Sequence, residues 1–402
     1  VCVISLFDVT EGNPYLKSRG QQEAALRREG AEVVVIEYAM EALTGARSHD
    51  PLAKFGRWIG RICSAPDGLA YLMPWVKLAE EVRRALAGRE FDGFLCYHFD
   101  ALAAVHPLCL SPMLAVVGDL WHLPGYFRWR EGSFSLSKYA VRGIRVALES
   151  MIAERAMSTL LASTTSCGAF AGHYAEWLKA HGFPKTLYFR TPVPDAAGPK
   201  WDLLRSEARA GRTGGKHRVL VIGDLATTST SSGLRAVAHA VLPRLVDEFG
   251  EDGFELRLVG GGAPPNDIAP ALRKPYVCFA GRVVPADPEF LAADVMIVPT
   301  NIPLGIRVRV ITAWSFGCPV VAHRANASGI PEMRHGENSL LADTDAQLVD
   351  AVLRVLTDHT LRSGLSAGGR GTFERSFSES VAGQQIVKEM ERLAGVQAVK
   401  RL

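Results

Sequence analysis

The chain has 402 residues, of which 48% are apolar and 22% charged, and its formal net charge is +3. This balance excludes a disordered or fibrous chain, and a charge so close to neutral does not call for a nucleic-acid partner. No apolar run reaches the roughly 20 residues of a membrane span. The seven cysteines contain no CxxC pair, so we expect reduced thiols, no metal site and a cytoplasmic protein.

Short apolar runs alternate with helical patterns through the first half of the chain. A helix is expected to begin at Asp100 and another to cover Cys167–His181. The expected strands are Val1–Leu6, Glu32–Tyr38, Phe91–Tyr97, Met113–Gly118, Ser158–Ser163 and Thr186–Val193. This order predicts a parallel sheet with helices on both faces.

A stretch rich in proline and glycine, between about residues 195 and 216, interrupts the pattern, which then restarts. Helices are expected at Arg307–Phe316 and Ser378–Leu393, and the apolar residues from Leu234 to Val246 share one helix face. The expected strands are His217–Ile222, Phe254–Val259, Tyr276–Ala280, Val295–Pro299 and Pro319–Ala322. We therefore predict an α/β protein with two Rossmann-like, doubly wound domains that face a cleft.

Three loops at strand ends in the second half are candidates for ligand binding: Gly223–Gly233, Gly260–Pro265 and Asn301–Arg309. Glycine allows backbone N–H groups to approach an anion, and helix N-termini favour negative charge, so a nucleotide diphosphate suits this pattern. For any single loop, a tight turn without a ligand is the better explanation, and only the three loops taken together favour a ligand.

Arg307 and Arg309 lie at the start of an expected helix, where basic charge opposes the helix dipole. A bound phosphate would compensate for this, because guanidinium groups bind phosphate in a bidentate manner. The alternative is a solvated or ion-paired helix face.

The segment from Gly305 to Ala322, which begins Gly-Ile-Arg-Val-Arg, resembles the donor-site helix of GT-B glycosyltransferases. It is most similar to the branch of the retaining family 4 type that reads Gly-Ile-Arg-x-Lys-x-x-Glu-Ala. Further matches in the same order are Leu258-Val259-Gly260, Phe279-Ala280-Gly281-Arg282-Val283, Ala292-Ala293-Asp294-Val295, Gly329-Ile330-Pro331-Glu332 and Gly336-Glu337-Asn338. Together they cover roughly residues 217–375.

The resemblance implies a GT-B fold that binds a nucleotide diphosphate sugar, retains the anomeric configuration and needs neither a metal nor a cofactor. It divides the chain into an acceptor-side domain (1–196), a linker (197–216), a donor domain (217–375) and a C-terminal helix (376–402) that crosses back to the first domain. Arg307 and Arg309 would stabilise the diphosphate. The substrate-binding residues would be Gly12, Asp119, Gly223, Gly260, Gly261, Gly262, Arg282, Val283, Leu304, Gly305, Ile306 and Thr312.

The sequence departs from this family at three places. Thr312 stands where the family usually has a Glu that holds the ribose hydroxyls, and Leu304 stands where many members carry the first Glu of the pair. Asp224 and Ser232 fall near the positions of the usual diphosphate-binding Arg and Lys. We infer that Arg307 and Arg309 take over the cationic role.

His122, which follows an expected strand and Asp119, is the candidate catalytic histidine of the first domain, because its side chain titrates near neutrality. A structural role is an equally good explanation, and His98 and Asp100 are rival candidates at the end of the preceding strand.

Trp121–Arg145 interleaves five basic residues with six aromatic ones, a composition that suits a membrane surface or a phosphate-linked lipid acceptor. The alternative is an ordinary loop packed on its own domain. Phe55–Arg61 is a second, weaker candidate for the same role.

The sequence thus predicts a glycosyltransferase that moves a sugar to a hydroxyl of a growing polysaccharide or lipid-linked glycan, in the cytoplasm or at the inner face of the membrane. A non-catalytic GT-B scaffold that binds a partner or a nucleotide is the alternative, and a nucleotide-sugar epimerase is the third possibility.

Overall fold

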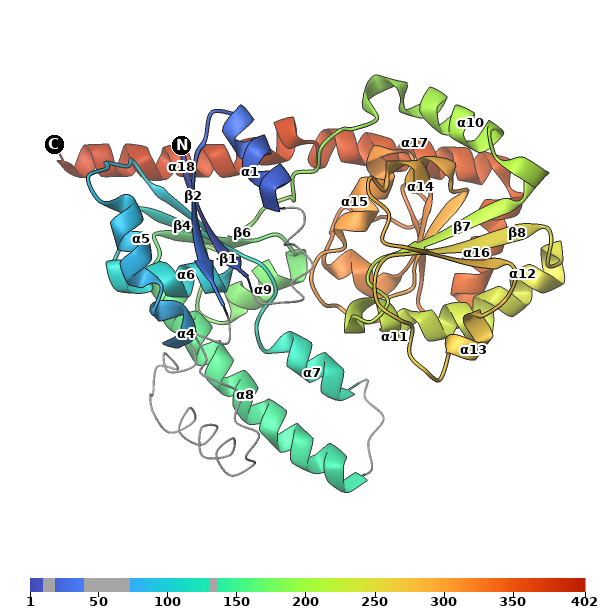
Figure 1. Ribbon diagram of the computed structural model, residues 1–402, viewed down its shortest axis with the longest axis horizontal. Coiled ribbons are helices and arrows are strands. Elements are labelled where there is room, and N and C mark those ends of the chain that lie inside the picture. Colours follow the sequence, from blue (N-terminus) through green and yellow to red (C-terminus); the bar gives the residue numbers. More distant parts are fainter. Residues whose placement is uncertain (10–18, 40–72, 131–135, 402) are drawn as a thin grey trace.

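The computed structural model describes residues 1–9, 19–39, 73–130 and 136–401. Two α/β units lie side by side, and every strand pairing within their sheets is parallel (Figure 1). The predicted α/β class with parallel sheets is therefore confirmed. Gly12 and the segment Phe55–Arg61 lie outside the described residues.

The first unit contains a two-stranded sheet and a four-stranded sheet of order β3-β4-β5-β6. Its central strand, β4, is buried along its whole length, which explains why it consists only of apolar residues. The strands are β1 (Cys2–Asp8), β2 (Glu32–Tyr38), β3 (Phe94–Tyr97), β4 (Met113–Val117), β5 (Ser166–Ala169) and β6 (Leu187–Tyr188).

Helices connect these strands, and two of them differ from the sequence prediction. The described helices are α1 (Arg19–Arg28), α4 (Met73–Val76), α5 (Ala79–Leu86), α6 (Phe99–Val105), α7 (Leu123–Arg130), α8 (Leu136–Ala162) and α9 (Gly172–Ala180). The predicted strand Ser158–Ser163 is wrong, because most of these residues form the last turn of α8. The predicted helix Cys167–His181 began too early, since the strand β5 occupies its first residues. A short apolar run looks alike in a buried helix and a buried strand, so its period alone cannot distinguish them.

The second unit is built on a six-stranded sheet of order β12-β11-β10-β7-β8-β9. Its strands are β7 (His217–Ile222), β8 (Phe254–Val259), β9 (Val277–Gly281), β10 (Val295–Val298), β11 (Val320–His323) and β12 (Leu340–Ala342). The strand order reverses between β10 and β7, and the carboxyl edge at such a reversal is where open α/β sheets bind ligands.

Helices cover both faces of this sheet and bury two separate apolar cores. On one face lie α11 (Thr228–Ala236), α12 (Leu242–Phe249), α13 (Ala269–Leu272) and α16 (Asp345–Thr357). On the other face lie α14 (Asp287–Ala292), α15 (Val308–Ser315) and α17 (His359–Ser376). A π-helical turn, Val237–Val241, joins α11 to α12, and the predicted apolar face from Leu234 to Val246 packs into the first of these cores.

Two helices connect the units. The stretch predicted as a linker, residues 197–216, contains α10 (Trp201–Ala210), which contacts α14 of the second unit. The terminal helix α18 (Glu379–Arg401) runs back along the first unit (Figure 1). There Leu393 packs beside β4, and Ser166 Oγ donates a hydrogen bond of 2.7 Å to Glu389 Oε1.

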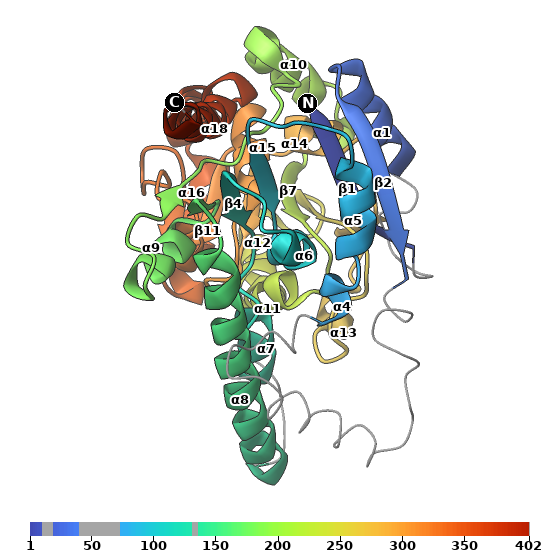
Figure 2. The same cartoon turned by 90° about the vertical axis from the view of Figure 1, so that its left-hand side faces the viewer.

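The helices α7 and α8 project together from the body of the first unit (Figure 2). Trp129 of α7 stacks on Tyr139 of α8 with 4.7 Å between ring centroids, and its indole N–H donates to the Tyr139 carbonyl. Trp121–Arg145 is therefore largely helical where it is described, and the alternative of an ordinary loop is wrong for α7 and α8. Among the described helices, none is both long enough and apolar enough to cross a bilayer.

Candidate active site at the junction of the two units

The two units meet where Tyr174, near the start of α9, reaches the loop that precedes α15. The Tyr174 hydroxyl donates to Asp119 Oδ1 at 3.2 Å and accepts a hydrogen bond from the Gly305 N–H at 2.6 Å. Gly305 has φ 69°, and a Cβ there would lie 2.5 Å from Asp119 Oδ1. The close approach of the two units therefore requires glycine at this position.

Arg307, two residues further along the same loop, is buried against this contact. Its side chain is 9% exposed, and no group in the described part of the chain accepts a hydrogen bond from its Nε. Burial lowers the pKa of Arg307, while the charge of Asp119 and the Tyr174 side chain act in the opposite direction. A buried guanidinium N–H without an acceptor is unfavourable, and an anionic ligand would satisfy it.

Arg309, by contrast, already has protein partners. Its guanidinium donates to the Ile222 carbonyl at 2.8 Å, to Thr230 Oγ1 at 3.2 Å and to Thr300 Oγ1 at 3.3 Å. Burial, and secondly the charge of Arg307, lower its pKa to about 9. Arg309 thereby ties α15 to the end of β7 and to α11, whereas Arg307 lies at the junction with the first unit.

The predicted glycine loops lie beside Arg309. A Cβ at Gly223 would overlap the Arg309 guanidinium, and a Cβ at Gly260 would overlap the Gly223 carbonyl. Both glycines have φ 145°, so the tight packing of the loops after β7 and β8 requires them. Gly261 and Gly262 follow in the same loop, and a Cβ at Gly262 would lie 2.6 Å from Asp224 Oδ1.

His122 does not join the residues at the junction. Its Nε2 lies 3.7 Å from Glu154 Oε1 of α8, and its ring lies 5.2 Å from that of Trp177. Burial, with a smaller contribution from His181, lowers its pKa to about 4. No described contact connects it with Asp119 or Arg307.

His98 lies nearer to the junction. It has φ 68°, a strained value for a residue other than glycine, and a Cβ at Gly118 would overlap its ring. Asp119 lies within its electrostatic reach. Its rival Asp100 accepts a hydrogen bond from the Trp121 side chain, and burial raises the pKa of Asp100 to about 6.

The remaining predicted residues are spread around the donor helix. Leu304 is buried against Phe127 of α7, and Ile306 is partly buried. Thr312 Oγ1 donates to the Val308 carbonyl at 3.2 Å. Arg282 and Val283 follow β9, where the Arg282 side chain is exposed.

Sequence reasoning missed Tyr174 and its neighbour His173. Burial lowers the pKa of His173, whose ring faces the Ser328 and Pro303 backbone near Asp119 and Arg307. The two residues lie in a helical pattern, and nothing in that pattern shows which turn would face a loop about 130 residues away. Glu332, part of a motif that we noted, also proves to join the units, since it accepts hydrogen bonds from Arg190 and Tyr188.

Comparison with known protein families gives one match, and it lies in the second unit. Residues 216–358 match the family model "Glycosyl transferases group 1". No curated protein sequence matches the chain.

Solved structures resemble the whole chain. Sucrose-phosphate synthase from Thermosynechococcus elongatus has a TM-score of 0.65 at 17% identity, over 98% of this chain and 99% of that one. Trehalose 6-phosphate synthase from Burkholderia multivorans has a TM-score of 0.62 at 12% identity, over 100% of this chain and 98% of that one. HepE from Anabaena, solved in complex with UDP-glucose, has a TM-score of 0.61 at 14% identity, over 98% of this chain and 100% of that one.

These findings confirm the predicted GT-B architecture of two Rossmann-like units. Residues 216–358 are similar to the group 1 glycosyltransferases, and this match together with the fold supports an enzyme of the glycosyltransferase class.

Proposed function

We propose that this protein transfers a sugar from a nucleotide diphosphate sugar to a hydroxyl of a growing polysaccharide or lipid-linked glycan, with retention of configuration and without a metal. The observation that carries the proposal is Arg307, a buried cation whose Nε has no acceptor in the described structure, at the start of α15. HepE has been solved with UDP-glucose, so a uridine nucleotide is the first donor to test.

The catalytic task on this proposal is electrostatic. As the bond between sugar and diphosphate breaks, negative charge grows on the leaving phosphate, and a positive group already in position stabilises it. Arg307 and the N-terminus of α15 provide this charge, because no side chain caps that terminus. Arg309 acts through position, since it fixes the start of α15 against β7.

The acceptor side of the reaction falls to the first unit. Asp119, held by Tyr174, lies against the donor loop, and His98 lies within electrostatic reach of it. We therefore assign to His98, rather than His122, the role of orienting or deprotonating an acceptor hydroxyl. The projecting α7 and α8 carry exposed Tyr126, Ile144 and Met151, and we propose that they contact the acceptor or a membrane surface.

A non-catalytic scaffold is the second candidate, and the charge of the donor loop favours it. The Asp224 carboxylate lies beside Gly262, and its negative charge would repel a diphosphate there. The Thr312 hydroxyl donates its hydrogen bond to the Val308 carbonyl of the same helix rather than to a ligand. A test of sugar release and transfer separates the two, because a scaffold binds the nucleotide without turnover. An epimerase would return an isomerised nucleotide sugar instead.

Calorimetry with UDP, GDP and uridine tests the donor site. Arg307→Ala should weaken binding of the preferred diphosphate about tenfold or more, because a hydrogen bond to a charged group contributes about 1.5–3 kcal/mol. Uridine binding should barely change. Arg83→Ala is the matched control, since Arg83 is exposed and pairs with Glu80 in the first unit. Equal diphosphate affinity of wild type and Arg307→Ala would overturn the assignment of Arg307.

A further inference from the structure

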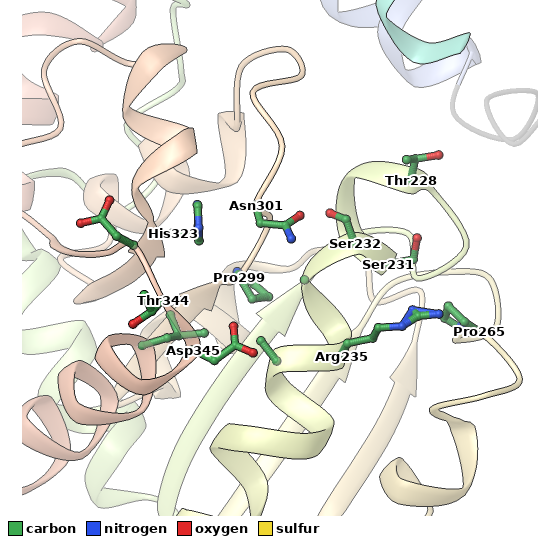
Figure 3. A pocket seen from close by; sticks show the side chains of 14 residues that line it. Thr228, Ser231, Ser232, Arg235, Pro265, Pro299, Asn301, His323, Thr344 and Asp345 are labelled. Atoms are coloured by element: carbon green, nitrogen blue, oxygen red, sulfur yellow. The ribbon is translucent and has the colours of Figure 1, made fainter. Parts of the chain in front are cut away.

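The cavity beside the donor loops belongs to the second unit. It has a volume of ≈590 Å³, and the three donor loops contribute Ser232, Pro265 and Asn301 to its wall (Figure 3). Each described residue that lines it lies between Thr228 and Leu348. On the proposed function, nucleotide binding therefore needs the second unit alone, whereas sugar transfer also needs the acceptor-side groups of the first unit in the correct place.

A short segment of the second unit, Gly329–Glu332, lies between the first unit and the donor loop, and we call it the junction segment. The Gly329 carbonyl accepts a hydrogen bond from the Gly172 N–H at 3.1 Å, and a Cβ at Gly329 would lie 2.7 Å from the Gly305 carbonyl. A Cβ at Gly172 would lie 2.5 Å from the Pro331 ring. The junction segment thus contacts the start of α9 as well as the donor loop.

The backbone of the junction segment is fixed to the second unit. Ile330 is fully buried in the core that also contains residues of α15. The Glu332 carbonyl accepts a hydrogen bond of 2.8 Å from Asn338 Nδ2, which also donates to Thr372 Oγ1 of α17. A change confined to the Glu332 side chain therefore leaves the path of this backbone in place.

The Glu332 carboxylate, by contrast, binds the first unit. Its Oε1 accepts from Arg190 Nε at 2.6 Å and its Oε2 accepts from the Tyr188 hydroxyl at 2.9 Å. Burial, and secondly the charge of Glu332, raise the pKa of Tyr188, so the phenol stays protonated and donates. The Glu332 side chain is 14% exposed, so water screens these charge-assisted hydrogen bonds only in part.

Tyr188 connects this contact with the acceptor side through the first sheet. In the register of the parallel strands, Tyr188 pairs with Ala169, and Ala169 pairs with Val117. Asp119 follows Val117 by two residues. Because a strand cannot slide without breaking its ladder of hydrogen bonds, the position of β6 constrains the end of β4. The contact made by Glu332 therefore constrains where Asp119 lies relative to the donor loop.

We propose that Glu332 is a positioning residue for sugar transfer, which holds the first unit, and with it Asp119, against the donor loop. The inference rests on the proposed function, because it assigns a residue to the same reaction. Glu332 acts through Tyr188 and Arg190 rather than on a substrate. A carboxylate suits this role, since its two oxygens accept from two donors at once and its charge strengthens both bonds.

Transfer kinetics and nucleotide calorimetry test the role. Glu332→Ala should lower kcat about tenfold to a hundredfold, while the Kd of UDP and the KM of the donor stay within about twofold, because only the placement of the first unit changes. Glu332→Gln keeps one acceptor oxygen and should recover part of kcat. The matched control is Glu255→Ala, which removes a partly buried carboxylate that binds Arg218 at 3.0 Å within the second unit, and it should transfer sugar like the wild type.

Amide hydrogen exchange of the protein without substrate measures the contact between the units directly. The Gly172 and Gly305 N–H groups both donate across the junction, to the Gly329 carbonyl and the Tyr174 hydroxyl respectively. Both should exchange faster in Glu332→Ala than in the wild type, because local opening exposes them to water. The N–H groups of β7, in the centre of the second sheet, should exchange at the wild-type rate.

A fall in kcat at unchanged nucleotide affinity, with faster exchange at the junction and partial recovery in Glu332→Gln, supports the proposal. An unchanged kcat, unchanged exchange, or a loss of UDP binding that matches the loss of kcat overturns it. If Glu332→Ala fails to fold, Glu332→Gln and Tyr188→Phe decide by the same measurements. If the wild type transfers no sugar, the proposed function fails, and hydrogen exchange still decides whether Glu332 holds the two units together.

Discussion

The two units bury their ionisable side chains in different ways. In the second unit, two carboxylates away from the donor helix are buried in ion pairs: Asp294, 1% exposed, accepts hydrogen bonds from Arg209 and Arg212, and Glu289 binds Arg257 at 2.6 Å. In the first unit, His122 and Asp100 are buried so that each pKa moves toward the neutral form, to about 4 and about 6 respectively.

This difference separates ion pairs that hold the second unit together from side chains of the first unit whose pKa is shifted by burial. Paired charges fix the strands and helices that position the donor loops, and they keep their ionisation over a wide pH range. Burial moves the pKa of His122 away from physiological pH and that of Asp100 toward it, and groups with shifted pKa values gather where proteins bind or react. The carboxylates that support the donor domain therefore stay charged at neutral pH, whereas Asp100 of the first unit titrates near pH 6.

Asp294→Asn tests the framework and should have the largest effect. The substitution removes the charge that pairs with Arg209 and Arg212, and breaking a buried ion pair costs about 3–5 kcal/mol. Urea unfolding at pH 7 measures it. Asp252→Asn is the control, since Asp252 is fully exposed and lies 3.4 Å from Lys216, and it should change stability by less than about 0.5 kcal/mol.

The same variant has a defined pH dependence. In the wild type, burial alone would raise the pKa of Asp294, but the hydrogen bonds that its carboxylate accepts from Arg212 and the Arg218 N–H hold this pKa below its ordinary value. A lowered folded-state pKa means that the stabilisation is complete above about pH 4 and is lost as the pH falls through the folded value. The difference between wild type and Asp294→Asn should therefore shrink below pH 4. A difference independent of pH would contradict the paired state.

Tyr174→Phe tests the contact between the two units. The variant leaves the Gly305 N–H and Asp119 without their shared partner, so stability should fall by about 1–3 kcal/mol. Sugar transfer should fall as well, because Asp119 would lose its position. Ser206→Ala, at an exposed position of α10 away from both sites, should leave both unchanged. Wild-type behaviour of Tyr174→Phe would show that the phenol does not couple the units.

His122→Gln tests the titrating side. The pKa of His122 is about 4 in the folded state and near 6.5 when unfolded, so the unfolded chain takes up the proton first. Stability should consequently decrease as the pH falls from 6.5 to 4, with a contribution of up to about 1.4 kcal/mol per pH unit. His122→Gln should flatten this slope, while His239→Gln, on an exposed position, should not. An unaltered slope in His122→Gln would refute the burial effect.

The double change Arg128→Glu and Ile144→Ser tests the projecting helices and should have the smallest effect. Binding to vesicles with anionic lipid should weaken by about 1–2 kcal/mol, because each basic residue near such a surface contributes about 1 kcal/mol. Nucleotide binding should stay as in the wild type. If the double variant binds vesicles as the wild type does, α7 and α8 do not contact the membrane.

Much of the second unit follows from local sequence. His217–Ile222 and Phe254–Val259 match the observed β7 and β8 residue for residue, because glycine or a polar turn bounds each apolar run. The donor helix was predicted within one residue at either end. In the first unit, the run Ser158–Ser163 misled, since six apolar and hydroxyl residues carry no period that separates a strand from the end of a long helix.

The sequence by itself determined the class of fold, the position of the donor helix and the presence of two arginines at its start. Only the tertiary structure decided that Arg309 binds the protein while Arg307 keeps an unpartnered Nε, and that Tyr174 rather than His122 meets the donor loop. The physical reason is distance along the chain. A helix or strand reflects neighbours within a few residues, whereas the partner and the burial of a side chain depend on segments brought together by packing.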